Sequence, residues 1–171
     1  MAKDIHIILE KKKKDNTWEY IEDKLDTFDC RSYRLFYILE NEFGHRGIPE
    51  ELKGKKFNYI EKYNIYDYDT TDSDLFHHSY ATLLELENYF DKLNKVFVSE
   101  EFMHLFLELG GVLPKGMSFD YETKDVYVEP MDEEDIQFKD FINYGLDEFR
   151  KIRDKYKLES EEIRMVYAFD C

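Results

Sequence analysis

The sequence DIHIILE at residues 4–10 decides the fold class, because it alternates between the two faces of an extended chain. One face is apolar and consists of Ile5, Ile7 and Leu9. The other face carries Asp4, His6, Ile8 and Glu10. This pattern predicts a half-buried strand with one apolar face and one mainly polar face.

A second alternating stretch, EIRMVYAF at residues 162–169, closes the chain and places Ile163, Met165, Tyr167 and Phe169 on one face. After the first strand, the lysine run at 11–14 followed by Asp15 and Asn16 predicts a turn, and 17–21 a second strand that pairs back. Strands at both ends with helices between them indicate an α+β fold. We expect the terminal strands to pair in a small mixed or antiparallel sheet packed by about four helices.

Four segments carry apolar residues at helical spacing. The predicted helices cover 30–42, a segment from 79 or 82 to 93, 99–109, and 135–155. Asp29 is the expected N-cap of the first, and Gly44 its end. Residues 50–64 are expected to hold a short irregular helix, and 117–121 with 125–129 a hairpin.

Composition favours a folded but strongly acidic protein. The 171 residues are 43% hydrophobic, and 39 Asp and Glu against 24 Lys and Arg give a net charge of −15. This length fits a single domain over 1–171. The charge disfavours broad nucleic-acid binding but leaves room for one small anionic ligand in a local basic pocket.

No stretch of the sequence has the pattern of a signal peptide or of a membrane span. The two cysteines, Cys30 and Cys171, have no zinc-site spacing and are interpreted as free thiols. We therefore expect a cytoplasmic protein without a membrane partner. The sequence does not predict an oligomeric state.

A tyrosine cluster at Tyr59, Tyr63, Tyr66 and Tyr68 has two interpretations. Most aromatic residues of the chain fall on apolar stripes, which favours a core role. Tyrosine is also favoured in binding surfaces, so the cluster is a candidate partner or ligand surface.

Asp4 and His6 are the first candidates for chemistry, because residues two apart on a strand project from the same face. His77 or His78 could complete a site for a divalent transition metal, since carboxylate and imidazole suit zinc, manganese or iron. A hydrogen-bonded pair or simple exposure to solvent explains the same pattern, and no cofactor is the primary expectation. The sequence lacks the common nucleotide-binding, hydrolase and metalloprotease motifs, so an enzyme is not favoured.

Three arginines, Arg31, Arg34 and Arg46, lie near predicted helix or loop edges. An arginine there could clamp a phosphate or carboxylate of a ligand. Pairing with one of the many carboxylates of the chain is the favoured alternative.

Six blocks of the sequence, in a fixed order, span nearly the whole chain. They are DIH at 4–6, Trp18, RSYRLF at 31–36, RGIP at 46–49, HSYATLLEL at 78–86 and RMVYAFD at 164–170. Together they resemble a family of small phage and prophage proteins that carry no established activity. That family often has a histidine two positions before the His-Ser pair, where this chain has Phe76.

The resemblance implies that polar residues of the blocks converge on one ligand-binding pocket. The candidate ligand-binding residues are Asp4, His6, Arg31, Tyr33, Arg46, His78 and Ser79, and Asp170 is among the polar residues expected to converge with them. This convergence is a hypothesis about geometry.

Three functions follow as expectations. The first is a phage-encoded, non-catalytic counter-defence protein in the host cytoplasm, which binds a small anionic nucleotide signal or blocks a host defence protein of the CRISPR or nucleotide-signalling type. The alternative is a small metal-dependent hydrolase acting on a phosphoester or nucleotide, with Asp4, His6 and His78 as ligands and Glu10 as base. A structural role in the virion ranks third.

Overall fold

The computed structural model describes residues 4–94, 117–119, 126–128 and 133–170. The chain divides into two compact units, Met1–Asn88 with Asn143–Cys171, and Tyr89–Ile142, and each is described by itself. The expectation of a single domain over the whole chain stays a prediction.

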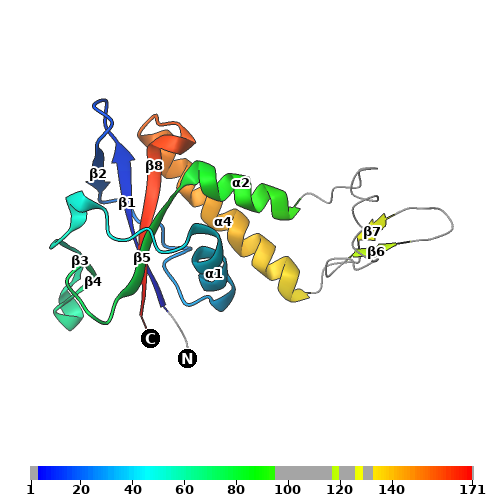
Figure 1. Cartoon of the computed structure of the whole chain (residues 1–171), viewed down its shortest axis with the longest axis horizontal. Helices are drawn as coiled ribbons and strands as arrows, with labels where there is room; N and C mark the ends of the chain where they lie inside the picture. The colour runs from blue at the N-terminus through cyan, green and yellow to red at the C-terminus, as the bar shows by residue number, and fades with distance from the viewer. Residues whose placement is uncertain (1–3, 95–116, 120–125, 129–132, 171) are drawn as a thin grey trace. The chain divides into compact units, whose positions relative to one another are not determined.

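The first unit is built on a four-stranded antiparallel sheet with strand order β2-β1-β8-β5 (Figure 1). Its strands are β1 (Asp4–Lys12), β2 (Trp18–Ile21), β5 (Phe76–Thr82) and β8 (Ile163–Asp170). Asp4 pairs with Asp170 and Lys11 with Ile163 at the two ends of the β1–β8 ladder. The predicted pairing of the terminal strands and the α+β fold class are confirmed.

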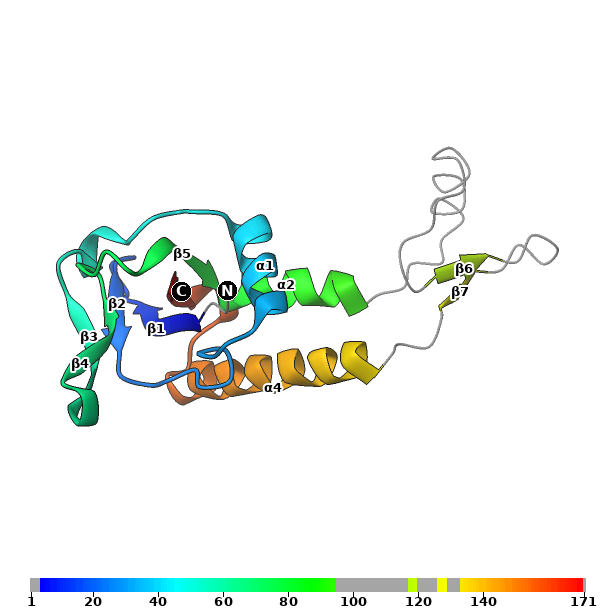
Figure 2. The same cartoon turned by 90° about the horizontal axis from the view of Figure 1, so that it is seen from below.

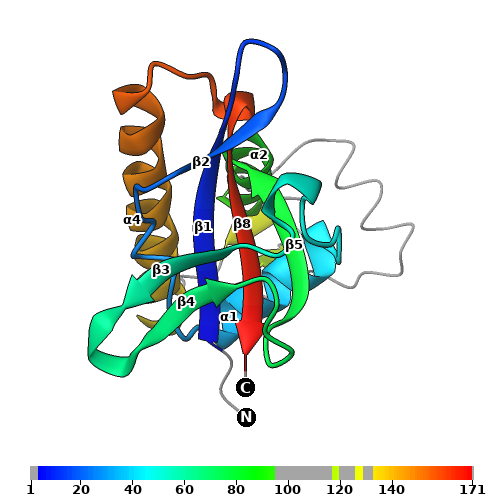
Figure 3. The ribbon, with the colours of Figure 1, turned by 90° about the vertical axis from the view of Figure 1, so that its left-hand side faces the viewer.

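One face of this sheet is covered by a two-stranded hairpin, β3 (Lys56–Ile60) with β4 (Ile65–Asp69), which crosses β1 and β8 in Figure 3. Phe57 and Tyr68 of the hairpin join Ile8 and Val166 of the sheet in one buried cluster. The expected strand with a single apolar face is therefore wrong, because the hairpin buries the second face of β1 as well. The expected irregular helix over 50–64 is also wrong beyond two short 3₁₀ turns, Glu50–Leu52 and Glu61–Tyr63.

The opposite face of the sheet packs against helices, as Figure 2 shows for α1 (Tyr33–Ile38) and for α4 (Glu133–Lys155), of which the part from Asn143 belongs to this unit. Helix α1 (Tyr33–Ile38) runs directly into a π-helical turn, Leu39–Phe43, and Gly44 with φ 61° follows as its C-cap. The N-cap is Ser32, whose hydroxyl accepts a hydrogen bond from the Leu35 amide. The expected cap, Asp29, was wrong, because its carboxylate accepts from the Ile7 amide of β1 instead.

Helix α2 (Leu83–Asn94) begins after Thr82, whose hydroxyl accepts from the Glu85 amide. Ser79, the earlier of the two expected starts, lies inside β5. The expected long helix is α4 (Glu133–Lys155), and a 3₁₀ turn, Ser160–Glu162, leads into β8.

In the second unit the structure describes an antiparallel pair, β6 (Met117–Phe119) and β7 (Val126–Val128), which confirms the predicted hairpin. The helix expected at 99–109 and the thiol of Cys171 lie outside the described residues. Cys30 is a free cysteine. Within the described part of the chain, no helix has the length and apolar character needed to cross a membrane.

The tyrosine cluster is divided by the hairpin. Tyr59, Tyr63 and Tyr66 are exposed, whereas Tyr68 is buried against the sheet. The core interpretation is confirmed for Tyr68, and a binding surface at the three exposed tyrosines stays a prediction.

Gly145 of α4 faces the ring of the buried Phe28, and a Cβ added there would lie 2.1 Å from a ring carbon. Alanine is intrinsically better than glycine inside a helix by about 1 kcal/mol. Overpacking a core commonly costs about 1–3 kcal/mol, so we expect Gly145→Ala to lower the free energy of unfolding by about 1–2 kcal/mol. Urea unfolding followed by circular dichroism measures this change.

The Phe28→Leu background is the control for this contact. If the ring of Phe28 causes the loss, Gly145→Ala costs less in that background than in the wild type. Equal costs in both backgrounds would place the cause elsewhere.

Candidate functional site

The candidate site consists of one histidine and the aspartates around it. It lies at the end of the four-stranded sheet where β1 begins at Asp4 and β8 ends at Asp170. His6 lies on β1, on the same face as Ile8, and this face is the one that the β3–β4 hairpin covers (Figure 3). Asp67 comes from β4 and Asp170 from the end of β8. Asp29 comes from the segment that precedes α1. We call His6, Asp29, Asp67 and Asp170 the His6 cluster.

Within the His6 cluster, both imidazole nitrogens face carboxylates. Nδ1 of His6 lies 3.1 Å from Oδ1 of Asp67 in hydrogen-bonding geometry. Nε2 lies 3.1 Å from Oδ2 of Asp170, but the angles do not make a hydrogen bond, so this buried nitrogen has no hydrogen-bond partner among the described groups. One ligand atom each from His6, Asp29 and Asp67 lies within 4.8 Å of the other two.

The charges of the His6 cluster shift two of its pKa values. Burial, and then the nearby charge of Asp67, raise the pKa of Asp29 to about 7. Burial alone would lower the pKa of His6, but its contacts with Asp67 and then Asp170 raise it to about 9. The raised pKa keeps His6 protonated at neutral pH, as an imidazolium beside three carboxyl groups.

Asp4 does not belong to this cluster of ligand atoms. Its carboxylate accepts two hydrogen bonds from Arg31, at 2.6 Å from Nε and 2.8 Å from Nη2. This contact lowers the pKa of Asp4. The favoured prediction for Arg31, pairing with a carboxylate of the chain, is confirmed.

Arg46 is likewise engaged inside the protein. Its guanidinium makes hydrogen bonds of 2.8 and 3.1 Å to Glu85, and its amide donates to the hydroxyl of Ser79 at 3.1 Å. His78 pairs through Nδ1 with the hydroxyl of Tyr68 at 3.0 Å.

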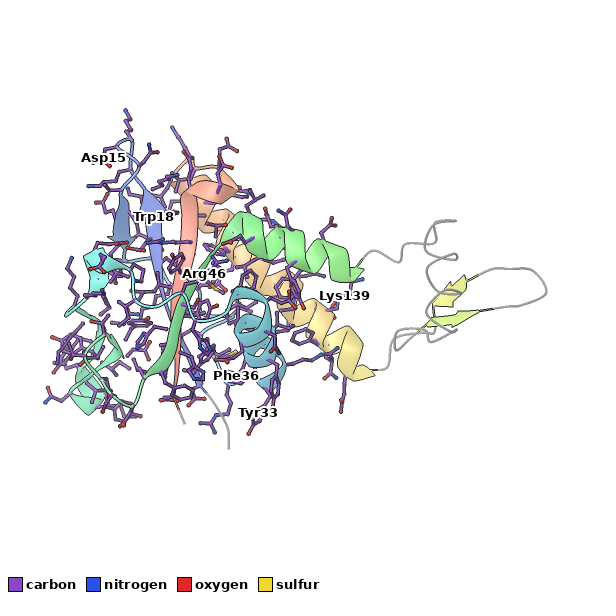
Figure 4. The ribbon with its side chains drawn as sticks, viewed as in Figure 1. Asp15, Trp18, Tyr33, Phe36, Arg46 and Lys139 are labelled. Atoms are coloured by element: carbon purple, nitrogen blue, oxygen red, sulfur yellow. The ribbon has the colours of Figure 1, made fainter. Side chains whose placement is uncertain are left out.

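The predicted pocket residues thus make their contacts in separate sets rather than around one common group. Asp4 pairs with Arg31, Arg46 with Ser79 and Glu85, and His78 with Tyr68. Figure 4 labels Tyr33 on α1 and Arg46 in the connection that follows this helix, and Tyr33 is about half exposed. The described residues form two groups that could hold a metal ion, and the alternative ligand set of Asp4, His6 and His78 is not one of them.

Of the predicted candidates, His6 and Asp170 meet in the His6 cluster, and His6 is the one that belongs to the group of three potential ligand atoms. The sequence reasoning missed its partners Asp29 and Asp67. Asp29 was predicted only as a helix cap, and Asp67 begins an acidic stretch, DYDTTDSD at 67–74, that contains no histidine. No spacing rule joins residues 6, 29 and 67, because the chain brings them together through three different elements.

The donor set suits a divalent cation. One imidazole nitrogen with carboxylate oxygens is a common combination for manganese, iron or zinc. Histidine ligands usually have a carboxylate, a carbonyl or water at the second ring nitrogen, which orients the ring. Asp170 occupies that position here, at 3.1 Å. Comparisons of the chain with protein-family models, with curated proteins and with solved structures found no match.

Proposed function

We propose that the protein binds a divalent cation, with His6, Asp29 and Asp67 as ligands and Asp170 as the group that orients His6. The observation that supports this most is the meeting of one imidazole nitrogen and two carboxylates from three elements. The excess of carboxylate charge supports it further, because burial penalises anions that lack a counter-charge. Oxygen-rich coordination favours Mn²⁺ as the ion.

Each residue of the His6 cluster would have a separate role at the cation. Asp29 and Asp67 would supply negative charge and His6 a nitrogen ligand, and the ion pair between Nε2 of His6 and Asp170 would orient the imidazole ring. A bound divalent cation polarises a phosphoryl oxygen and lowers the pKa of bound water. Hydrolysis of a phosphoester is therefore the reaction class that we propose for this site.

A Mn²⁺ titration of the full chain tests the binding. We expect wild-type protein to bind Mn²⁺, as measured by loss of the electron paramagnetic resonance signal of the free ion. We expect Asp67→Asn and Asp29→Asn each to weaken binding by about tenfold or more, because both remove a ligand charge. Asparagine keeps an oxygen acceptor, and circular dichroism checks that the variants are folded.

Asp4→Asn is the matched control, because Asp4 lies on the same strand as His6 but pairs with Arg31. We expect this variant to bind Mn²⁺ like the wild type. No Mn²⁺ binding by the wild type, or binding that Asp67→Asn and Asp29→Asn leave unchanged, would overturn the proposal. A loss with Asp4→Asn alone would favour the ligand set predicted from the sequence.

Phosphoester hydrolysis is tested separately on a chromogenic phosphodiester in the presence of Mn²⁺. Turnover that is lost in Asp67→Asn supports the hydrolase. Mn²⁺ binding without turnover rejects the hydrolase and keeps the cation site.

The counter-defence function stays a prediction, as does the resemblance to phage proteins. Arg31 and Arg46, the candidates for binding an anionic nucleotide, both pair with carboxylates of the chain. A nucleotide would have to displace these carboxylates, so the cation site is the better supported proposal. A rise in melting temperature with a nucleotide, abolished by Arg31→Ala, would reverse this order.

A further inference from the structure

A second cluster of potential metal-ligating side chains shares no residue with the His6 cluster. It consists of Glu40, His45 and His77, and we call it the Glu40 cluster. Its three ligand atoms all lie within 4.8 Å of one another. The proposed cation site uses none of these residues.

Glu40 is the centre of the Glu40 cluster. Its Oε2 lies 3.0 Å from Nε2 of His45, and its Oε1 lies 2.5 Å from Nδ1 of His77. The two imidazole rings stack with their centroids 4.1 Å apart and their planes 22° apart. Two nitrogen donors and a carboxylate therefore converge on one small region.

The backbone is distorted at Glu40 and His77 and directly before His45. Glu40 lies in the π-helical turn Leu39–Phe43, and His45 follows Gly44, which has a positive φ. His77 has φ 53°, a left-handed conformation that few non-glycine residues adopt, at an irregularity in the pairing of β5 with β8. π-Turns and strained residues concentrate at functional sites, where the strain positions a side chain.

The contacts of Glu40 with His45 and His77 do not by themselves explain the distorted backbone. The side chains of His45 and His77 are 51% and 40% exposed, and exposed ion pairs contribute little to stability. Glu40 is less exposed, at 17%. Burial by itself raises its pKa, but the hydrogen bonds of His45 and His77 outweigh this and lower it, so the carboxylate is held as an anion.

We propose that Glu40, His45 and His77 form a second metal site, for a nitrogen-preferring divalent ion such as Zn²⁺. Two imidazoles and one carboxylate form the protein ligand set of many zinc sites, which leave a further position for water or substrate. The exposed sides of both histidines give that position access to solvent. On the inner side, the ring of Phe76 contacts that of His77 edge to face, with centroids 4.7 Å apart.

Isothermal titration of the full chain with Zn²⁺ tests the proposal, with His77→Asn as the main variant. Asparagine adopts positive φ readily, so this change removes the ligand and keeps the backbone conformation. We expect the variant to bind one Zn²⁺ fewer per chain than the wild type, or to bind it at least about tenfold more weakly. Glu40→Gln is expected to give the same result, because it removes the anionic ligand.

His78→Gln is the matched control, because it removes the neighbouring imidazole, which pairs with Tyr68. We expect Zn²⁺ binding to be unchanged in this variant. Nitrogen-15 NMR of the imidazoles gives an independent readout. The ring signals of His77 are identified by their absence from the spectrum of the His77→Asn variant, and Zn²⁺ is expected to shift them in the wild type. Equal Zn²⁺ stoichiometry and affinity in wild type, His77→Asn and Glu40→Gln would overturn the proposal.

The two cation proposals fail separately. Asp67→Asn, which removes a ligand of the His6 cluster, is expected to leave the Zn²⁺ response of His45 and His77 intact. If His77→Asn weakens Zn²⁺ binding while no variant of the His6 cluster affects Mn²⁺, the Glu40 cluster stands alone.

Discussion

Arg164→Ala is expected to lower the free energy of unfolding by about 3–5 kcal/mol, because it leaves the buried carboxyl group of Glu10 without its counter-charge and hydrogen-bond donor. Arg164 is 6% exposed and lies opposite Glu10 in the β1–β8 ladder. Its Nε donates a hydrogen bond to Oε2 of Glu10 at 2.8 Å, and its Nη2 lies 2.7 Å from the same oxygen. Nη2 also lies 2.7 Å from Oε1 of Glu51.

Two aromatic rings enclose the same guanidinium. Its central carbon lies 4.1 Å from the ring centroid of Trp18 and 4.5 Å from that of Tyr80. A planar guanidinium can stack on both rings while it binds carboxylates in its plane, which the ammonium group of lysine cannot do. Arg164 therefore joins β1, β2, β5 and β8 with the 3₁₀ turn that carries Glu51.

Urea unfolding measures this loss, with Arg164→Lys as the matched variant. Lysine keeps the charge but loses the stacking, so we expect a smaller loss than with alanine. A combined Arg164→Met and Glu10→Gln variant removes both charges and is expected to lose less than Arg164→Ala alone. An Arg164→Ala protein that unfolds at the wild-type urea concentration would contradict the prediction.

As the pH rises, the Glu10→Gln variant is expected to become more stable relative to the wild type. The carboxyl group of Glu10 is fully buried, and its Oε1 has no hydrogen-bond donor among the described groups. Burial, and then a hydrogen bond shared with Glu51, raise the pKa of Glu10 from 4.5 to about 7, although Arg164 opposes this shift. When Glu10 is protonated, its neutral carboxyl group can donate a hydrogen bond to Glu51, so the buried group gains the partner that it lacks as an anion.

The sign follows from the raised pKa. The neutral form of Glu10 contributes stability that is fully present below pH 4.5 and is lost as the pH rises to about 7. Glutamine is neutral at every pH, so its variant avoids this loss. Between pH 5 and pH 8 we expect the difference in unfolding free energy to move by about 2 kcal/mol in favour of Glu10→Gln.

Unfolding free energies at the two pH values test this expectation, with Glu50→Gln as the control. Glu50 is an exposed glutamate that pairs with Lys53. Its replacement is expected to change stability by less than about 0.5 kcal/mol at either pH. A Glu10→Gln difference that is independent of pH would show that Glu10 is ionised in the folded protein throughout this range.

The elements with a regular period could be predicted from the sequence. The alternation at 4–10 and 162–169 placed β1 and β8, and the apolar stripe of 135–155 placed α4, because period follows directly from backbone geometry. Residues 50–64 were misinterpreted, since Phe57 and Tyr68 become a buried pair of contacts only when β3 and β4 fold onto the sheet. A strand that is stabilised by tertiary burial carries a weak local signal.

The candidate sites divide in the same way. The sequence by itself determined that His6 projects from a terminal strand beside other polar groups, because alternation fixes the side on which a strand residue lies. Only the tertiary structure decided which groups meet it. Asp29 and Asp67 reach His6 from two other elements, and Glu40, His45 and His77 meet through a π-turn, a loop and a strained strand residue. These contacts depend on strand register and on backbone distortion between residues that are far apart in the chain. A local sequence pattern does not contain this information.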